Sequence, residues 1–405
     1  MGKRMVWLGF LAGLLLHGSG ALVIGIERLV PSQYSYIQDA IDAADDGDVI
    51  TVSPGTYYEN LSISGTFLTI QSTNPEDPGQ TIIDGSSYGV TTVAFYGYET
   101  DYCILRGFTI TGASDSGIQC YYGGPTIEKC IIEGNTGNYD SGGIWIYEGY
   151  PYITNCTIRN NTAYGCGGGV YMYDSCPMIR HSMIVDNHAD EQGGGIGIQR
   201  YDGWYPHVRN CVLAGNYAGY EGGAIYGYCD DPYTDFIHLV NCTLADNDSY
   251  RGGGIYNDGE GYSQATNSIV WGNLSIYEGG QIYSEPYGGS DLQYCDVEGN
   301  GASGSNIDQD PRFVPDDDYY HLTPSSPCIN AGDPASDYSQ EPHGGEGRIN
   351  MGAYGNTAEA AVLDSDGDEL PDSWEVLHWP GDDPETLEER KKVLEQFRSE
   401  IESFK

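Results

Sequence analysis

Positive charge is scarce in this chain. Its 17 Lys and Arg residues stand against 59 Asp and Glu residues, which gives a formal net charge of −42. Such a charge sets a strong negative field that repels nucleic acid and anionic lipid. Nucleic acid is therefore excluded as an expected partner, and polyanionic glycans are disfavoured unless cations bridge them. Neutral sugars and metal-bridged partners are compatible with the field.

Long hydrophobic runs and large apolar side chains are also few. Only 8 Phe accompany 58 Gly and 35 Tyr, which predicts many tight turns, an aromatic surface and a thin core. The one long apolar run, Val6 to Leu16, lies in residues 1–21 between a basic start and a small-residue exit, a pattern typical of a signal peptide. We expect a secreted, extracellular or cell-surface protein with no integral membrane span after signal cleavage.

What the sequence does contain is a repeat. A six-residue phrase from Cys or Ser to Asn occurs seven times, and its closing Asn residues are 26 to 31 residues apart. A fixed inner spacing with an elastic outer period indicates a solenoid. The copies begin at Cys130, Cys156, Ser182, Cys211, Cys242, Ser268 and Cys295.

A Gly-Gly phrase follows each of the first six copies, and alternating stretches such as Ile144 to Tyr147 lie between the phrases. Such alternation, rich in Ile, Val and Tyr, favours half-buried strands. Each repeat is therefore predicted to be one coil of a parallel β-helix in the all-β class. Equivalent residues then stack about 4.8 Å apart, so identical side chains form ladders.

Two Asn columns and one Cys column are predicted to be such ladders. The closing Asn residues form the first column, and Asn155, Asn210, Asn241 and Asn267 form the second; both suit turns, because Asn tolerates left-handed backbone geometry. The repeated Cys alternates with Ser, so it is interpreted as a small buried filler with a free thiol. Pairing of Cys166 with Cys176 remains open.

Apolar positions Ile37, Ala40, Ile41 and Ala44 share one helical face, so a short N-terminal helix is predicted to cap the first coil. We expect a signal peptide at 1–21, the β-helix at 22–360, an acidic calcium-binding-like loop at 361–380 and a C-terminal helix at 381–405. The helix followed by strands around Pro54-Gly55 resembles the start of pectin-lyase-like proteins, a resemblance that implies a right-handed β-helix solenoid.

Two further resemblances concern surface proteins. The Gly-Gly-x-Ile and x-x-x-Asn phrases resemble those of the bacterial polymorphic outer membrane proteins. The run that includes Asp310 to Val314, His321 to Pro334 and Ile349 to Tyr354 resembles the tail of secreted bacterial β-helix proteins labelled choice-of-anchor Q. Both resemblances imply display at a bacterial surface rather than a reaction.

The strongest chemical signal is an acidic loop near the C-terminus. Its carboxylates stand at positions one, three, five, nine and twelve, with a backbone carbonyl at seven, which is the ligand spacing of a calcium loop. Because its Gly stands at position four, the loop resembles thrombospondin type 3 and dockerin-type motifs more than an EF-hand. Calcium is the predicted cofactor, and the predicted ligands are Asp364, Asp366, Asp368, Leu370, Asp372 and Glu375.

Enzymatic signals are weaker, and no motif selects a catalytic residue. Arg180 and Arg209 fall at equivalent positions of successive coils, which indicates either an anion site or two solvated arginines. The triplet Asp235-Phe-Ile echoes pectin methylesterases, but the flanking motifs are missing, so it is interpreted as a coil strand. Aromatic residues on alternating positions favour either a strip for sugar or protein contact or a structural ladder. They are Trp145, Tyr171, Tyr173, Tyr226 and Tyr256.

Two functions follow from these patterns. The leading hypothesis is a secreted or cell-surface, calcium-stabilised β-helix that contacts an extracellular glycan or surface protein without catalysis, in the manner of an adhesin. The alternative is a polysaccharide lyase or glycoside hydrolase that acts on an extracellular polysaccharide. An enzyme would bring carboxylates and a basic residue together in one groove, whereas a display protein would show uniform ladders and aromatic strips.

Overall fold

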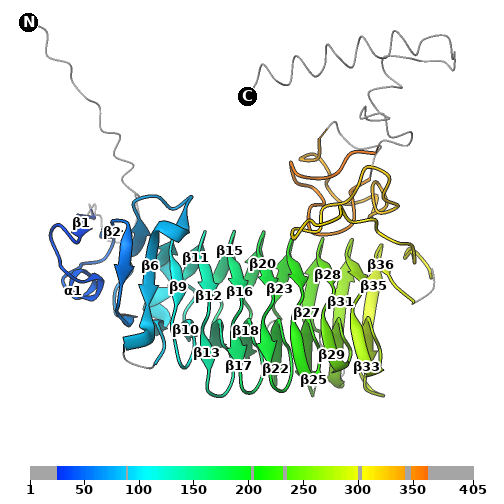
Figure 1. Cartoon of the computed structure of the whole chain (residues 1–405), viewed down its shortest axis with the longest axis horizontal. Coiled ribbons are helices and arrows are strands. Elements are labelled where there is room, and N and C mark those ends of the chain that lie inside the picture. The colour runs from blue at the N-terminus through cyan, green and yellow to red at the C-terminus, as the bar shows by residue number, and fades with distance from the viewer. Residues whose placement is uncertain are drawn as a thin grey trace, which may run out of the picture.

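The computed structural model describes residues 25–87, 90–201, 205–230, 235–299, 303–342 and 348–363. Across these residues the chain winds into a parallel β-solenoid with very little helix, as the repeats predict (Figure 1). Its strands form four sheets of eleven, ten, nine and six strands, named sheets A, B, C and D here. The predicted signal peptide, C-terminal acidic loop from residue 364 and C-terminal helix lie outside the described residues.

Within each sheet, neighbouring strands come from neighbouring coils. Sheet A contains β1 (Glu27–Val30), β2 (Val49–Val52), β5 (Thr69–Ser72), β8 (Ile104–Arg106), β11 (Thr126–Glu128), β15 (Tyr152–Thr154), β19 (Met178–Arg180), β23 (His207–Arg209), β27 (Asp235–Val240), β31 (Tyr262–Thr266) and β35 (Gly289–Gln293). Sheet B contains β3 (Gly55–Tyr57), β6 (Thr81–Asp84), β9 (Thr109–Thr111), β12 (Ile131–Glu133), β16 (Thr157–Arg159), β20 (Met183–Val185), β24 (Val212–Ala214), β28 (Thr243–Ala245), β32 (Ile269–Trp271) and β36 (Asp296–Val297). Sheet C contains β4 (Leu61–Ser64), β7 (Val93–Tyr96), β10 (Ile118–Tyr121), β14 (Ile144–Tyr147), β18 (Val170–Tyr173), β22 (Ile196–Arg200), β26 (Ile225–Cys229), β30 (Ile255–Gly259) and β34 (Ile282–Ser284). Sheet D contains β13 (Thr136–Gly137), β17 (Thr162–Ala163), β21 (His188–Ala189), β25 (Tyr217–Glu221), β29 (Asp248–Arg251) and β33 (Leu274–Glu278).

A regular coil visits the sheets in the order A, B, D, C, and left-handed residues make its corners. In the coil that begins with β15, Asn155 (φ 52°) and Asn160 (φ 52°) turn the chain before and after β16, and Gly167 (φ 72°) turns it before β18. The Gly-Gly phrase lies at this last corner, where the coils approach most closely. A Cβ on Gly168 would lie 2.5 Å from the carbonyl oxygen of Gly194, so the phrase is required by contact between coils.

Alternating side chains from all four sheets meet inside the coil and form the core. Ile127, Ile153 and Ile179 occupy one inward column of sheet A, in register and with no exposed surface. Burying a side chain of this size stabilises the fold by roughly 1.5–3 kcal/mol. The core is therefore a stack of aliphatic ladders, long and thin as expected.

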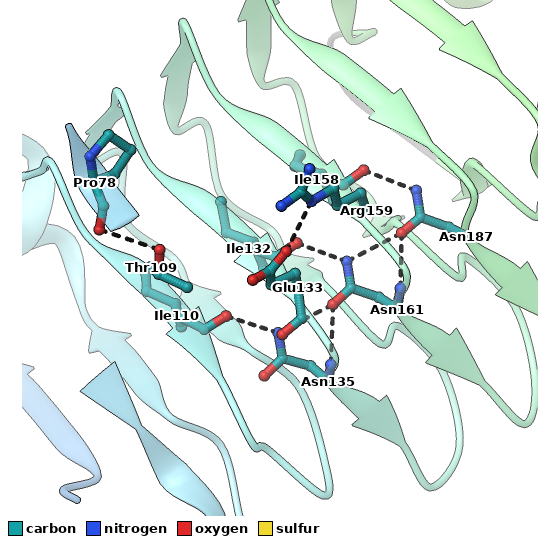
Figure 2. A network of polar contacts seen from close by, with 10 residues as sticks. All are labelled: Pro78, Thr109, Ile110, Ile132, Glu133, Asn135, Ile158, Arg159, Asn161 and Asn187. Atoms are coloured by element: carbon teal, nitrogen blue, oxygen red, sulfur yellow. Dashed lines mark hydrogen bonds and ion pairs between the residues drawn. The ribbon is translucent and has the colours of Figure 1, made fainter. Parts of the chain in front are cut away.

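The closing Asn column is a hydrogen-bonded ladder, as predicted (Figure 2). The Nδ2 of Asn135 donates to the Oδ1 of Asn161 at 3.0 Å, and the Nδ2 of Asn161 donates to the Oδ1 of Asn187 at 3.0 Å. The same contact continues to Asn216, Asn247 and Asn273 at 2.8–3.0 Å, and Gln281 ends it. Each of the six Asn side chains is buried, so these residues are structural. Asn300 lies outside the described residues.

The Cys column is also structural. Its five cysteines are buried and free, and their thiols donate to carbonyl groups of the preceding coil, as Cys242 does to the Val208 oxygen at 3.4 Å. Burial raises the pKa of Cys242 and of Cys295 to about 12, so both thiols stay protonated. Cys166 and Cys176 are free as well, which answers the question about their pairing.

The N-terminal end is capped by the predicted helix, α1 (Ile37–Asp42). Ile37, Ala40 and Ile41 are buried against the first coils, and the Glu59 carboxylate accepts hydrogen bonds from the N–H groups of Ile37 and Gln38. Three short 3-10 helices interrupt the early, irregular coils: η1 (Pro78–Gln80), η2 (Gly85–Ser87) and η3 (Tyr98–Tyr102).

The strands end at β36, and residues 303–342 and 348–363, called the tail here, return along the outside of the later coils (Figure 1). The tail covers the outer face of sheet B, which is apolar there. Met351 packs on Ile269, and Ala353 packs on Val212 and Ala214. These two small cores attach the tail to the solenoid.

The second Asn column differs from its predicted role. Asn155, Asn210, Asn241 and Asn267 occupy left-handed turn positions as expected, but their side chains do not bond along the stack. The amide of Asn210 donates instead to the carbonyl of Gly355 at 2.8 Å, and that of Asn241 donates to the same oxygen at 3.1 Å. Asn210, Asn241 and Asn267 therefore anchor the tail, which supplies carbonyl groups to the first two amides and the Ser336 hydroxyl to the third.

Candidate functional site

All six predicted calcium ligands, Asp364, Asp366, Asp368, Leu370, Asp372 and Glu375, lie outside the described residues. Calcium binding therefore stays a prediction. Among the residues that are described, no group of three or more His, Cys, Asp or Glu side chains is arranged to hold a metal ion.

Sheet C carries the predicted aromatic residues on its outer face, in two columns. The first column holds Trp145, Tyr171, Tyr226 and Tyr256 in register, interrupted by Gly197 between Tyr171 and Tyr226. Tyr171 and Tyr256 are only 5% and 3% exposed, so the expectation that they are exposed is wrong for these two residues. The Gly-rich corners lie close beside them: a Cβ on Gly167 would lie 2.7 Å from the Cβ of Tyr171, and one on Gly252 would lie 3.0 Å from the Cβ of Tyr256.

The phenols of the first column are committed to structural hydrogen bonds. Tyr171 donates to the Oε1 of Gln199 at 2.8 Å, and Tyr226 donates to the Oδ2 of Asp258 at 2.6 Å. Tyr256 donates to the Oε1 of Glu285 at 2.6 Å. Each bond runs diagonally to the next coil, so this column is a structural ladder, one of the two interpretations that the sequence allowed.

The second column is the more exposed one. Six tyrosines follow one another across six coils, with ring centroids separated by 5.3, 6.1, 5.1, 6.0 and 5.8 Å. We call this set the tyrosine row; its members are Tyr96, Tyr121, Tyr147, Tyr173, Tyr201 and Tyr228. Tyr201 follows strand β22, in which Gln199 holds the register position between Tyr173 and Tyr228. Tyr96 is 43% and Tyr201 44% exposed.

Ring orientation varies along the tyrosine row. Tyr96 and Tyr121 are stacked, as are Tyr147 and Tyr173, whose planes differ by only 5°. Tyr121 and Tyr147 are tilted by 42°, and Tyr201 lies at 51° to Tyr173. Rings tilted in this way cannot cover each other's faces completely, so the row offers both ring surface and phenol groups to solvent.

Three phenols at the centre of the row have raised pKa values. Burial raises the pKa of Tyr121 to about 12, with smaller contributions from Tyr96 and Asp115. The pKa of Tyr147 is raised chiefly by a hydrogen bond to Glu148, and burial raises that of Tyr173. These three phenols are therefore neutral groups on a strongly acidic protein.

Sequence reasoning identified only Tyr173 of this row. A signal was present, because the members up to Tyr173 each end a strand of sheet C and so recur at a fixed position of the coil. The alternation of residue types along a strand shows which side chains point outward, but it does not show which of the two outward columns is the more buried.

Sheet A brings the predicted arginines together. Arg180 in β19 and Arg209 in β23 are register partners on the outer face, as their spacing indicates. The Nε atoms of both are buried without a hydrogen-bond partner. Neither guanidinium forms an ion pair with any residue in the described part of the chain.

Histidines flank the two arginines. Burial and the charge of Arg180 lower the pKa of His181, and burial together with His238 and Arg209 lowers that of His207. The ring centroids of His207 and His238 are 5.4 Å apart. The imidazoles are therefore held in the neutral form, and the two guanidinium groups carry the positive charge of this face.

Asp235 begins strand β27, and Phe236 and Ile237 are buried in the core, so the pectin methylesterase-like triplet is a coil strand as interpreted from the sequence. No helix in the described residues is long and apolar enough to cross a membrane.

The chain was compared with known proteins. No curated protein matches the chain. Among solved structures, pectate lyase Pel9A is 16% identical and aligns over 78% of this chain and 90% of its own, with a TM-score of 0.45. Pectin methylesterase from carrot is 12% identical over 71% and 87%, with a TM-score of 0.42. The pectin methylesterase from Aspergillus niger is 15% identical over 73% and 92%, with a TM-score of 0.38.

The family model that describes the right handed beta helix region matches residues 37–187 and 94–273, which together span most of the coils. The family match identifies the solenoid as right-handed. The chain belongs to the right-handed β-helix family.

Proposed function

We propose that this protein is a secreted or cell-surface, adhesin-like β-helix that binds an extracellular glycan through the tyrosine row and does not cleave it. The observation that carries the proposal is the unbroken line of six tyrosines, with centroids 5.1 to 6.1 Å apart along the solenoid axis. A line of amphipathic rings suits a linear polymer, because ring faces contact sugar C–H groups while phenols bond sugar hydroxyls.

The net charge of the chain favours neutral polysaccharides over acidic ones as the class of ligand. A net charge of −42 repels an acidic polymer, and the protonated phenols provide no positive charge to offset that repulsion. Neutral donors instead match the many hydroxyl groups of a neutral glycan.

Three carboxylates beside the row support binding without catalysis. Asp258 and Glu285 accept hydrogen bonds from the phenols of Tyr226 and Tyr256, and Asp115 accepts from the amide of Gln119 at 2.8 Å. Glycoside hydrolysis needs two carboxyl groups on either side of the bond to be cleaved. These three carboxylates are engaged in holding the ladders.

Affinity electrophoresis through gels that contain one polysaccharide each tests the proposed surface. The double variant Tyr147→Ala, Tyr173→Ala removes the stacked centre of the row. Each ring contributes about 0.5–1.5 kcal/mol, so the double variant should bind about tenfold more weakly or worse. Tyr152→Ala is the matched control, because Tyr152 is 37% exposed on a strand of sheet A. Equal retardation of both variants would contradict the proposal.

We also propose that calcium orders the segment Asp364 to Glu375. Five carboxylates within twelve residues repel one another unless a cation binds, and oxygen ligands at this spacing suit calcium. Limited proteolysis with calcium and with chelator tests this proposal. Calcium should protect the chain after residue 360 and leave the coils unaffected, and replacing Asp366 and Asp368 by Ala should abolish the protection. Identical cleavage in both conditions would refute it.

A further inference from the structure

A cavity of about 600 Å³ lies where the tail meets the coils, away from the tyrosine row. We call it the tail cleft. Its coil wall includes Arg180, which ends strand β19, and His181 and Asn155, which lie in the turns after β19 and β15. Its tail wall includes Gln340, Tyr354 and Glu359. A volume of this order accommodates a small organic molecule.

Arg180 in this cleft has an unusual environment. Its buried Nε has no partner, and its register neighbour on the next coil is a second arginine, Arg209. Two like charges on adjacent strands repel each other, and a partly buried cation without a counter-ion is costly. An anion in the cleft would relieve both effects.

No carboxylate of the described residues forms an ion pair with Arg180, although the full sequence contains 59 Asp and Glu residues. Glu359 is the carboxylate on the cleft wall, but its side chain is 70% exposed and its Oε2 lies 3.9 Å from the Nε2 of His321. Arg106 provides a comparison, because it occupies the same outward column of sheet A and pairs with Glu128 at 3.3 Å. The terminal Nη groups of Arg180 thus form no ion pair within the described residues and stay available to an external oxyanion.

The rest of the cleft suits a hydroxylated ligand. The amide of Asn155 has Thr154 as its hydrogen-bond partner, at 3.2 Å, and Gln340 faces it from the tail with an exposed side chain. Tyr354 adds an aromatic ring that stacks on the His321 ring, with centroids 4.0 Å apart. Amides and an aromatic ring around a cation form a combination that recognises polar, ring-shaped or chain-shaped polyols.

We propose that the tail cleft binds a small hydroxylated carboxylate, such as a sugar acid, with its carboxylate on the guanidinium of Arg180. A single negative charge fits better than the two charges of a phosphate ester, because every added charge is repelled by the field of a −42 protein. The site is separate from the tyrosine row and does not depend on it.

Titration of the full chain with gluconate, followed by calorimetry, tests this site. Wild-type protein should bind one gluconate saturably, and glucose, which lacks the carboxylate, should not compete. Arg180→Gln should weaken binding at least about tenfold, as expected for a charge-assisted hydrogen-bonded contact. Arg180→Lys keeps the positive charge but lacks the planar guanidinium, so its affinity for gluconate should lie between those of wild type and Arg180→Gln.

Arg106→Gln is the matched control. It removes the same charge from the same column of sheet A and should leave gluconate affinity within about twofold, because Arg106 lies outside the cleft. Absence of saturable gluconate binding to wild-type protein would overturn the proposal, whatever the variants do. Equal binding by wild type and Arg180→Gln would overturn it too, and phosphate binding as tight as gluconate would overturn the choice of a carboxylate.

Discussion

Replacing Asn187 by Ala should break the closing Asn ladder at its centre. The Asn187 side chain makes four hydrogen bonds in a fully buried position. Its Nδ2 donates to the Ile158 oxygen at 2.9 Å and to the Oδ1 of Asn216 at 3.0 Å. Its Oδ1 accepts from the backbone N–H and the Nδ2 of Asn161 at 3.1 and 3.0 Å.

The expected loss follows from these contacts. Four hydrogen bonds at roughly 1 kcal/mol each amount to about 4 kcal/mol of the free energy of unfolding. The backbone N–H of Asn161 is then buried without its acceptor, which alone costs about 1–3 kcal/mol. Since the two estimates overlap, we expect a total of about 4–5 kcal/mol, which is a large part of the stability of most domains.

Urea unfolding and amide hydrogen exchange measure this effect together. Exchange is needed because solenoids unfold in parts, and the damage should be concentrated in the coils that contain Asn161, Asn187 and Asn216. Asn155→Gly is the control: that side chain is exposed and bonds only Thr154, and Gly accepts its φ of 52°. A loss below about 1 kcal/mol for Asn187→Ala, or a loss equal to the control, would refute the reasoning.

Other consequences can be measured on the same protein. Ladder thiols such as Cys242 should be inert to a thiol reagent in the folded protein and react after denaturation without reductant; a denatured chain with one free thiol or none would contradict this. Tyr226→Phe should cost about 1–3 kcal/mol of the free energy of unfolding in urea, because it leaves the Oδ2 of Asp258 without its donor; an unchanged midpoint would refute that role. Burial raises the pKa of Asp296 in the folded protein. The protonated side chain therefore stabilises the fold fully below the unfolded pKa of about 3.9, and this stabilisation is lost as the pH rises through the folded pKa. Asp296→Asn should flatten this fall in stability, and an unaltered pH profile of the unfolding midpoint would count against it.

Much of the fold could be predicted because each sequence repeat corresponds to one coil of the solenoid. The Asn and Cys columns, the Gly corners and the helix at Ile37 all follow from spacing and local chemistry, and spacing also placed Arg180 beside Arg209. A ladder contact is local in this sense: each residue meets its own equivalent one coil away, so one repeat predicts the next.

The course of the tail could not be predicted in the same way, since it depends on long-range packing. One signal existed. The outward column of sheet B that begins with Glu133 and Arg159 continues as Val185, Ala214 and Ala245 in later coils, which indicates that something covers the later part of this face. The tail forms one wall of the tail cleft, so the positions of Arg180 and Arg209 in the sequence could predict only the wall formed by the coils.

The most direct test of the central claim combines binding and cleavage in one sample. A neutral polysaccharide that retains the wild-type protein in affinity gels is incubated with it, and the reducing ends and the absorbance of unsaturated products are followed over time. The account predicts retention that falls at least about tenfold in Tyr147→Ala, Tyr173→Ala, with product no higher than for heat-denatured protein. Steady release of either product from a retained polysaccharide, abolished by substitution of a single carboxylate, would contradict it and make the protein a polysaccharide lyase or hydrolase.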